Sequence, residues 1–147
     1  MKQKMQTPYA FTAAGLLIYY LVLATMLALM LVRNDQNFWA YFGFIAQYEI
    51  GSHVSNFALS TLFLFTAGAL NMLTKASWRY ILSAALILAI ANFIAEIFVT
   101  ALNTKDIVDA IYGVAGVIFA LGLLPFMQKY GIRRNSVHSH QEPKRNR

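Results

Sequence analysis

Cysteine is absent from the 147 residues, which excludes disulfides, thiol nucleophiles and thiolate metal sites. Charge is also scarce, because only 12% of the residues are charged, well below the roughly one quarter that soluble domains carry. Acidic side chains are the scarcest, with six Asp and Glu against twelve Lys and Arg. Since 59% of the residues are hydrophobic, water is a poor solvent for most of this chain. We therefore predict an integral membrane protein.

Long apolar runs with few or no charged residues occupy most of the sequence. They cover residues 8–32, 54–74, 80–102 and 110–127. Each is close to the ~20 residues with which an α-helix crosses ~30 Å of hydrocarbon. The first run is too long for the apolar region of a signal peptide, so we expect it to stay as a span. The sequence predicts an all-α polytopic fold, with a four-helix transmembrane domain over 1–127 and a disordered basic tail over 128–147.

Positive charge is distributed unevenly between the two sides of the predicted helices. Ten of the twelve basic residues fall on one side: Lys2, Lys4, Lys75, Arg79, Lys129, Arg133, Arg134, Lys144, Arg145 and Arg147. The positive-inside rule therefore places both termini and the 75–79 loop in the cytoplasm, with the protein in the plasma (inner) membrane. Because the positive charge reports membrane sidedness, we predict no nucleic-acid partner.

An aromatic segment, "NFWAYFGFIAQY", occupies residues 37–48 between the first two spans. It is too short to cross a bilayer. Aromatic side chains with a polar tip favour the headgroup region, so we expect a short helical segment that is interfacial or re-entrant on the outer side.

Polar residues recur at helical spacing at the outer ends of the second and third spans. His53, Asn56 and Ser60 share one stripe of the second span, and Asn92 and Glu96 share a stripe of the third. An intramembrane carboxylate is costly unless it is paired or protonated, so Glu96 should face the bundle. His53, Asn56 or another donor at the outer end is its expected partner.

The fourth span begins with two of the six acidic residues, Asp106 and Asp109. Asp106 suits a helix N-cap, and Asp109 in the first turn suits the positive end of the helix dipole. Gly113, Gly116 and Ala120 follow at helical spacing and would let another helix pack closely.

Together these positions predict a ligand-binding pocket that opens outward. Its residues are His53, Asn56, Glu96, Asp106 and Asp109. No glycine-rich phosphate loop, set of metal ligands or nucleophile beside a base is evident, so the sequence favours no enzyme and predicts no cofactor or metal.

Two stretches resemble the VanZ-like membrane proteins over about residues 45–122. "EIGSHVSNFALSTLFLF" resembles the start of that family's second helix, and "EIFVTALNTKDIVDAIYGVAG" resembles its later signature of a glutamate, a short turn, Asp-x-x-Asp and a glycine-rich helix. The matching residues are Glu49, His53, Glu96, Asp106, Asp109 and Gly116. Ile50 and Asn103 depart from the family at or near basic positions, and Val99 and Gly113 depart from expected amides. The resemblance implies a small cell-envelope protein linked to antibiotic resistance of the glycopeptide (teicoplanin) type.

Three interpretations stay open. An accessory or binding protein would hold the polar part of a membrane lipid or lipid-linked envelope ligand, such as a glycoconjugate, in the predicted pocket. A small proton-coupled carrier would use Glu96 and His53 to exchange protons with the outer side, and would need a homo-oligomer because four helices are few. A structural subunit of a membrane complex would use the small-residue face at 113–120 against a partner subunit.

Overall fold

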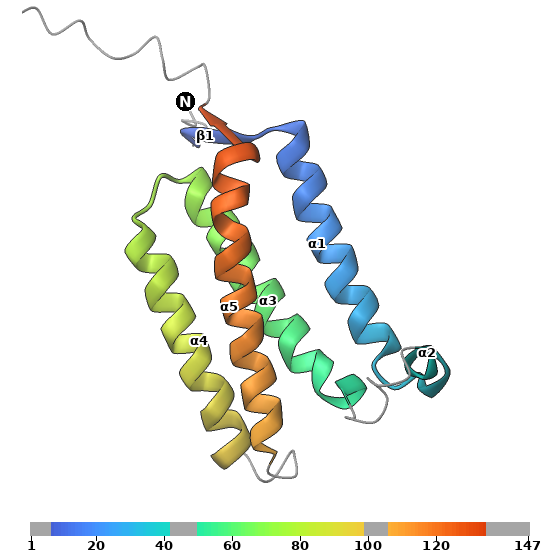
Figure 1. Cartoon of the computed structure of the whole chain (residues 1–147). Coiled ribbons are helices and arrows are strands. Elements are labelled where there is room, and N and C mark those ends of the chain that lie inside the picture. Colours follow the sequence, from blue (N-terminus) through green and yellow to red (C-terminus); the bar gives the residue numbers. More distant parts are fainter. Residues whose placement is uncertain (1–6, 42–49, 99–105, 135–147) are drawn as a thin grey trace, which may run out of the picture.

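The computed structural model describes residues 7–41, 50–98 and 106–134. Its elements are β1 (Tyr9–Phe11), α1 (Ala13–Val32), α2 (Gln36–Ala40), α3 (Ile50–Leu73), α4 (Trp78–Phe98), α5 (Ile107–Tyr130) and β2 (Ile132–Arg134). Figure 1 shows α1, α3, α4 and α5 as a bundle of long helices, with β1 and β2 at one end and α2 at the other.

Four of the helices are long and apolar enough to cross a membrane. Their candidate spans are Ala13–Val32, His53–Leu73, Trp78–Glu96 and Ile107–Tyr130. Large apolar side chains cover their outer faces, with Leu17 68% and Phe63 66% exposed. Such a surface is unfavourable in water and favourable in lipid. The prediction of a mostly helical fold with four such helices and a short extra one is confirmed.

Helices α3 and α5 meet at the centre of the bundle. The largest fully buried apolar side chains at this interface are Leu64, Phe65, Leu124 and Met127, none more than 1% exposed. Apolar packing between these two helices thus fixes the positions of the residues at their ends.

The small-residue face of α5 is used for this packing. Gly113, Gly116 and Ala120 are all buried. A Cβ atom on Gly116 would collide with the backbone carbonyl of Phe57 in α3, and one on Gly113 would collide with the side chain of Asn92 in α4. The close packing predicted for this face therefore occurs within the chain.

The first span is shorter than predicted, because α1 begins at Ala13 and not at residue 8. Thr12 is its N-cap, and the Thr12 hydroxyl accepts a hydrogen bond from the Gly15 N–H at 2.9 Å. The preceding residues pair instead with β2 in an antiparallel ribbon, with Tyr9 opposite Arg134 and Phe11 opposite Ile132.

Helix and strand structure continues past residue 128, where the predicted tail begins. Helix α5 continues to Tyr130, and β2 extends the folded part to Arg134. The Thr12 N–H donates to the Gly131 carbonyl at 2.9 Å, and the Thr12 hydroxyl donates to the Tyr130 carbonyl at 2.9 Å. These backbone partners come from the other end of the chain, so the local sequence of the tail does not reveal them. Residues 135–147 lie outside the described residues.

The aromatic segment contains the short helix α2. Asp35 is its N-cap, and its carboxylate accepts from the N–H groups of Asn37 and Phe38 at 3.0 and 3.2 Å. The Trp39 indole donates to the Val32 carbonyl at 2.9 Å and so ties α2 to the end of α1. The helical prediction, made for residues 37–48, is confirmed for residues 37–40, whereas residues 42–48 lie outside the described residues.

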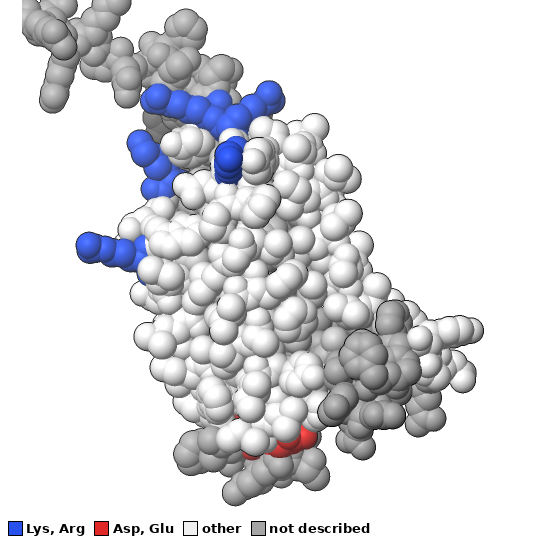
Figure 2. All heavy atoms as spheres, viewed as in Figure 1, with Lys and Arg blue, Asp and Glu red and all other residues white. Residues whose placement is uncertain are grey.

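Apart from Arg33, which lies at the end of α1 beside α2, the described charges separate to opposite ends of the bundle, as Figure 2 shows for one face. The end with β1 and β2, which we call the basic end, carries Lys75, Arg79, Lys129, Arg133 and Arg134. The opposite end, which we call the acidic end, carries the described carboxylates Asp35, Glu96, Asp106 and Asp109. Since β1 pairs with β2, both ends of the described chain lie at the basic end.

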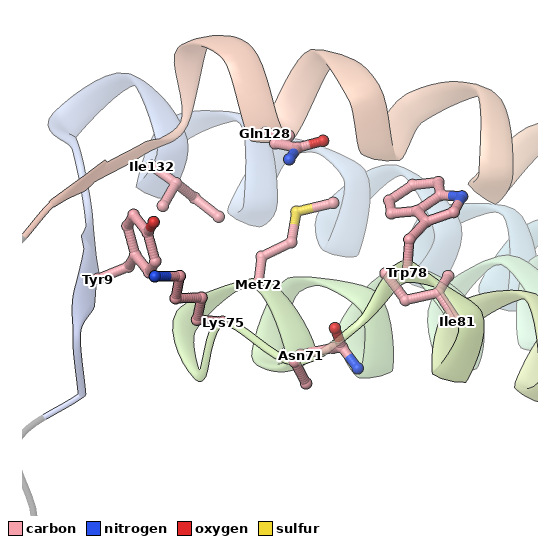
Figure 3. A pocket seen from close by; sticks show the side chains of 9 residues that line it. Tyr9, Asn71, Met72, Lys75, Trp78, Ile81, Gln128 and Ile132 are labelled. Atoms are coloured by element: carbon pink, nitrogen blue, oxygen red, sulfur yellow. The ribbon is translucent and has the colours of Figure 1, made fainter.

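A cavity of about 310 Å³ lies at the basic end (Figure 3). The chain segments that meet there provide its lining: Tyr9, Asn71, Met72, Lys75, Ala76, Trp78, Ile81, Gln128 and Ile132. Polar and apolar side chains are mixed in its wall.

Candidate functional site at the acidic end

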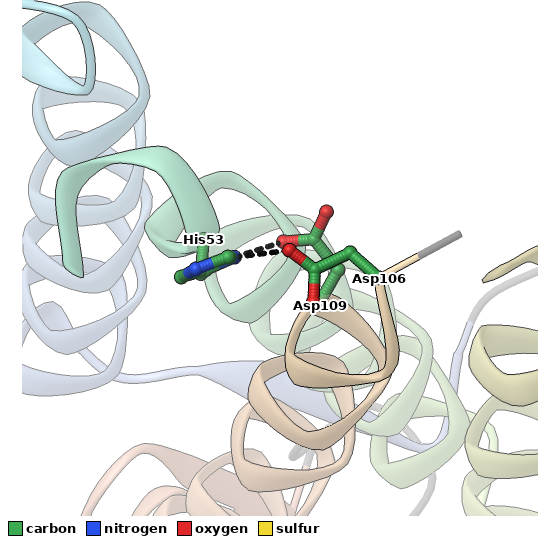
Figure 4. Close-up of side chains that lie close together, drawn as sticks. All are labelled: His53, Asp106 and Asp109. Carbon is green, nitrogen blue, oxygen red and sulfur yellow. Dashed lines mark hydrogen bonds and ion pairs between the residues drawn. The ribbon is translucent and has the colours of Figure 1, made fainter. Parts of the chain in front are cut away.

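Three polar side chains from α3 and the start of α5 meet at the acidic end (Figure 4), and we call them the acidic-end cluster: His53, Asp106 and Asp109. The His53 Nδ1 lies 2.7 Å from the Asp109 Oδ1 and 3.7 Å from the Asp106 Oδ2. Their side chains are 11%, 37% and 16% exposed for His53, Asp106 and Asp109. The inner pair, His53 and Asp109, is thus largely shielded, while Asp106 reaches the surface.

Local backbone chemistry explains the positions of the two aspartates. Asp106 is the N-cap of α5, and its Oδ1 accepts from the Val108 N–H at 2.9 Å, as the sequence predicted. Its other carboxylate oxygen faces His53. Asp109 lies in the first turn, where the helix dipole favours a negative charge.

Tyr112 is a neighbour of the cluster that the sequence reasoning missed. Its ring centroid lies 5.4 Å from that of His53. Tyr112 follows Asp109 by three residues and so projects from the same face of α5. The three-residue spacing from Asp109 could therefore have identified Tyr112 from the sequence.

A polar ladder continues from the cluster along α3 and α4. The Asn56 Nδ2 donates to the Glu96 Oε1 at 3.4 Å, and one turn further the Asn92 Nδ2 donates to the Ser60 Oγ at 3.1 Å. The predicted stripe on α3 therefore makes side-chain contacts along its whole length, because His53 contacts α5 and the other two residues contact α4.

Glu96 faces the bundle as predicted, and of the expected partners Asn56 donates a hydrogen bond to it. Its side chain is half-buried, so it is less enclosed than its place in an apolar run suggests. Glu49 and Asn103, which the sequence places beside this site, lie outside the described residues.

The cluster has the composition of a metal site. One ligand atom from each of its three residues lies within 4.8 Å of the others, so together they could hold a cation. The 2.7 Å His53–Asp109 contact is, however, the ordinary length of a charge-assisted hydrogen bond, and one Asp106 oxygen already serves the helix cap. A shared proton is thus enough to satisfy the pair.

The donors and acceptors of the cluster define what it can bind. Ionised carboxylates only accept hydrogen bonds, and a neutral imidazole donates one. The cluster therefore favours hydroxyl groups and ammonium groups, and it disfavours anions.

Comparison of the chain with protein-family models, curated proteins and solved structures finds no match. No family is therefore shown for this chain, and its resemblance to VanZ-like proteins stays a prediction from the residues.

Proposed function

We propose that this protein is a small integral membrane protein of the cell envelope that binds the polar part of a lipid-linked or glycoconjugate ligand at the acidic-end cluster. The observation that carries the proposal is the 2.7 Å contact between His53 and Asp109, which joins two candidate spans. Charged groups inside apolar helices are expensive and mark functional sites by default. This pair also has an exposed neighbour, Asp106, through which a ligand can approach.

Ligand chemistry follows from the excess of acceptor oxygens. Sugar hydroxyls are donors that suit the carboxylates of Asp106 and Asp109, whereas a phosphate would be repelled. An aromatic side chain also packs against the start of α3 at this end, because a Cβ atom on Gly51 would collide with the Trp39 indole of α2. Aromatic rings with a polar tip suit the junction between a headgroup and its acyl chain. These features support a glycolipid-like ligand.

The basic end faces the cytoplasm in this proposal, so the cluster opens to the outside. Its support is the positive-inside rule applied to the charge separation between the two ends. Single-cysteine labelling tests it directly because the chain has no native cysteine. Tyr41→Cys should react with an impermeant maleimide on intact cells, and Ala76→Cys only after permeabilisation. The reverse pattern would contradict the orientation.

A proton-coupled carrier is the alternative, and the polar ladder gives it some support. Beyond Ser60 and Asn92, however, the centre of the described bundle is filled by Leu64, Phe65 and Leu124. The described residues of one chain therefore offer no continuous polar path to the basic end. Transport would need a homo-oligomer or a partner subunit, and binding is the simpler activity.

Ligand-dependent stabilisation tests the binding proposal. The purified protein in nanodiscs would be titrated with a polyprenyl-linked disaccharide, and its thermal midpoint measured. Asp109→Asn keeps the size of the side chain and its contact with His53 but removes the charge, so the protein should fold and lose most of the stabilisation. Tyr19→Phe is the control, because it removes a hydroxyl that lies 3.3 Å from Thr66 and outside the cluster.

The predicted resistance phenotype gives a second measurement. Glycopeptide susceptibility would be compared in cells that carry wild-type protein, Glu96→Gln or Asp109→Asn, with membrane abundance measured alongside. Full complementation by both variants at normal abundance would leave packing as the role of these carboxylates and contradict the proposal.

A further inference from the structure

The cavity at the basic end is built from segments that are far apart in the sequence. Tyr9 comes from β1, Asn71 and Met72 from α3, Trp78 and Ile81 from α4, Gln128 from α5 and Ile132 from β2. Its volume of about 310 Å³ is at the lower end of the range of small-molecule sites. The cavity is thus large enough for a headgroup-sized ligand.

One cation, Lys75, lines this cavity, and an unusual backbone conformation holds it there. Lys75 has a φ of 59°, in the left-handed region that non-glycine residues seldom adopt. Its N–H donates to the Met72 carbonyl at 3.3 Å, and the Ala76 N–H donates to the Asn71 carbonyl at 3.2 Å. This pair of bonds is a Schellman motif, in which glycine usually occupies the position of Lys75.

A lysine at this position carries a conformational penalty that a glycine would not. Residues in such conformations persist where the surrounding structure determines them, and they gather at binding sites. Figure 3 shows the Lys75 side chain extending along the cavity toward Tyr9. The turn therefore directs a positive charge into the cavity.

No described carboxylate is available to neutralise this charge. The four described acidic residues all lie at the acidic end, whereas Lys75 shares the basic end with Arg79, Lys129 and Arg133. The potential in the cavity is therefore positive, which favours an anion.

The other lining residues indicate where the ligand comes from. Trp78 is the first residue of α4, so the cavity lies at the end of a candidate span. Trp and Tyr side chains are enriched at the level of lipid headgroups. The side-chain amides of Asn71 and Gln128 also line the cavity and offer hydrogen-bond donors.

We propose that this cavity binds the phosphate group of an anionic ligand, with Lys75 as its main cationic contact. Two sources offer that group, a phospholipid headgroup in the same leaflet and free phosphate in solution. Basic pockets between spanning helices are a known way to bind anionic headgroups. The site lies at the opposite end from the acidic-end cluster and is independent of the function proposed there.

The lipid arm of the test uses the full chain in nanodiscs of phosphatidylcholine with increasing phosphatidylglycerol. The thermal midpoint should rise with phosphatidylglycerol in the wild type. Lys75→Asn removes the charge, and asparagine tolerates the left-handed backbone, so the half-saturating lipid fraction should rise about tenfold. Lys75→Gly, which relaxes the turn completely, should behave in the same way and guards against a folding defect in the first variant.

Arg79→Gln is the matched control, because it removes one positive charge from the same end at a residue outside the cavity lining. Its half-saturating lipid fraction should stay within about twofold of wild type, because the Arg79 side chain does not line the cavity. The second arm titrates inorganic phosphate into the protein in a zwitterionic detergent. A Lys75-dependent shift in either arm supports the site and identifies its source. Equal responses of wild type and Lys75→Asn in both arms, or an equal loss in Arg79→Gln, would overturn it.

Discussion

The two ends of the bundle are held together by different kinds of contact. At the acidic end, the side chains of His53 and Asp109 bond to each other, and so do those of Asn56 and Glu96. At the basic end, backbone groups close the fold through the β1–β2 ribbon and the Thr12–Gly131 hydrogen bond. The Lys75 side chain, at the same end, takes no part in these backbone contacts. The stability of the acidic end should therefore depend on the polarity of its side chains. The stability of the basic end should depend on whether a substitution adds atoms between its backbones.

Gly15→Ala should have the largest effect on stability, because it adds one carbon where the backbones meet. A Cβ atom on Gly15 would collide with the Gly131 carbonyl, so the change should lower the free energy of unfolding by about 3 kcal/mol. Denaturant unfolding in mixed micelles measures it. Gly122→Ala in α5 is the control, since its Cβ meets nothing within 4 Å and the better helix propensity should stabilise by about 0.5–1 kcal/mol. Equal effects of the two changes would contradict the close approach.

His53→Ala should come next, because it leaves Asp109 without its partner in a shielded position. We expect a loss of about 2 kcal/mol, the cost of an unsatisfied charged group. A double-mutant cycle with Asp109→Ala, which removes the carboxylate altogether, should give a coupling of about 1 kcal/mol, and additive effects would show that the 2.7 Å contact contributes nothing.

Lys75→Gly should have a smaller effect of the opposite sign. In zwitterionic lipid the free energy of unfolding should rise by about 1 kcal/mol, because glycine adopts the left-handed conformation without strain. Ala76→Gly is the control in the same turn and should not stabilise. If Lys75→Gly destabilised the protein in this lipid, the turn would not be strained.

Asp106→Asn should have the smallest effect, no more than about 0.5 kcal/mol, because asparagine caps helices as well as aspartate does. Asp106→Ala, which removes the cap, should cost about 1 kcal/mol in the same unfolding measurement. A large loss with asparagine would mean that the charge of Asp106, and not its capping oxygen, holds this end together.

The parts of this structure that depend on local sequence could be predicted. Four apolar runs predict four long helices, because in a membrane a helix satisfies all the backbone hydrogen bonds of its own segment. Asp106 indicates the start of a helix, because its carboxylate can accept hydrogen bonds from the first free N–H groups. The spacing of His53 and Asn56 places them on one stripe without knowledge of any neighbour.

The remaining features depend on how separate segments meet. Whether Glu96 contacts His53 or Asn56 is decided by the register of α4 against α3, which no single helix reveals. The ribbon joins residues from opposite ends of the described chain, and the strands are too short to show a pattern of their own. The end of α3 could not be predicted from a glycine, because Lys75 occupies the position in the turn where glycine is usual.

The β1–β2 ribbon also sets a sequence of events during synthesis. Thr12 leaves the ribosome early. Tyr130, whose carbonyl accepts a hydrogen bond from the Thr12 hydroxyl, follows 118 residues later. At ~5–20 residues per second this interval is roughly 6–24 s. Thr12 is therefore made well before the carbonyl groups of Tyr130 and Gly131 to which it donates. Strand β2 is made after the four long described helices, and its pairing with β1 closes the ribbon.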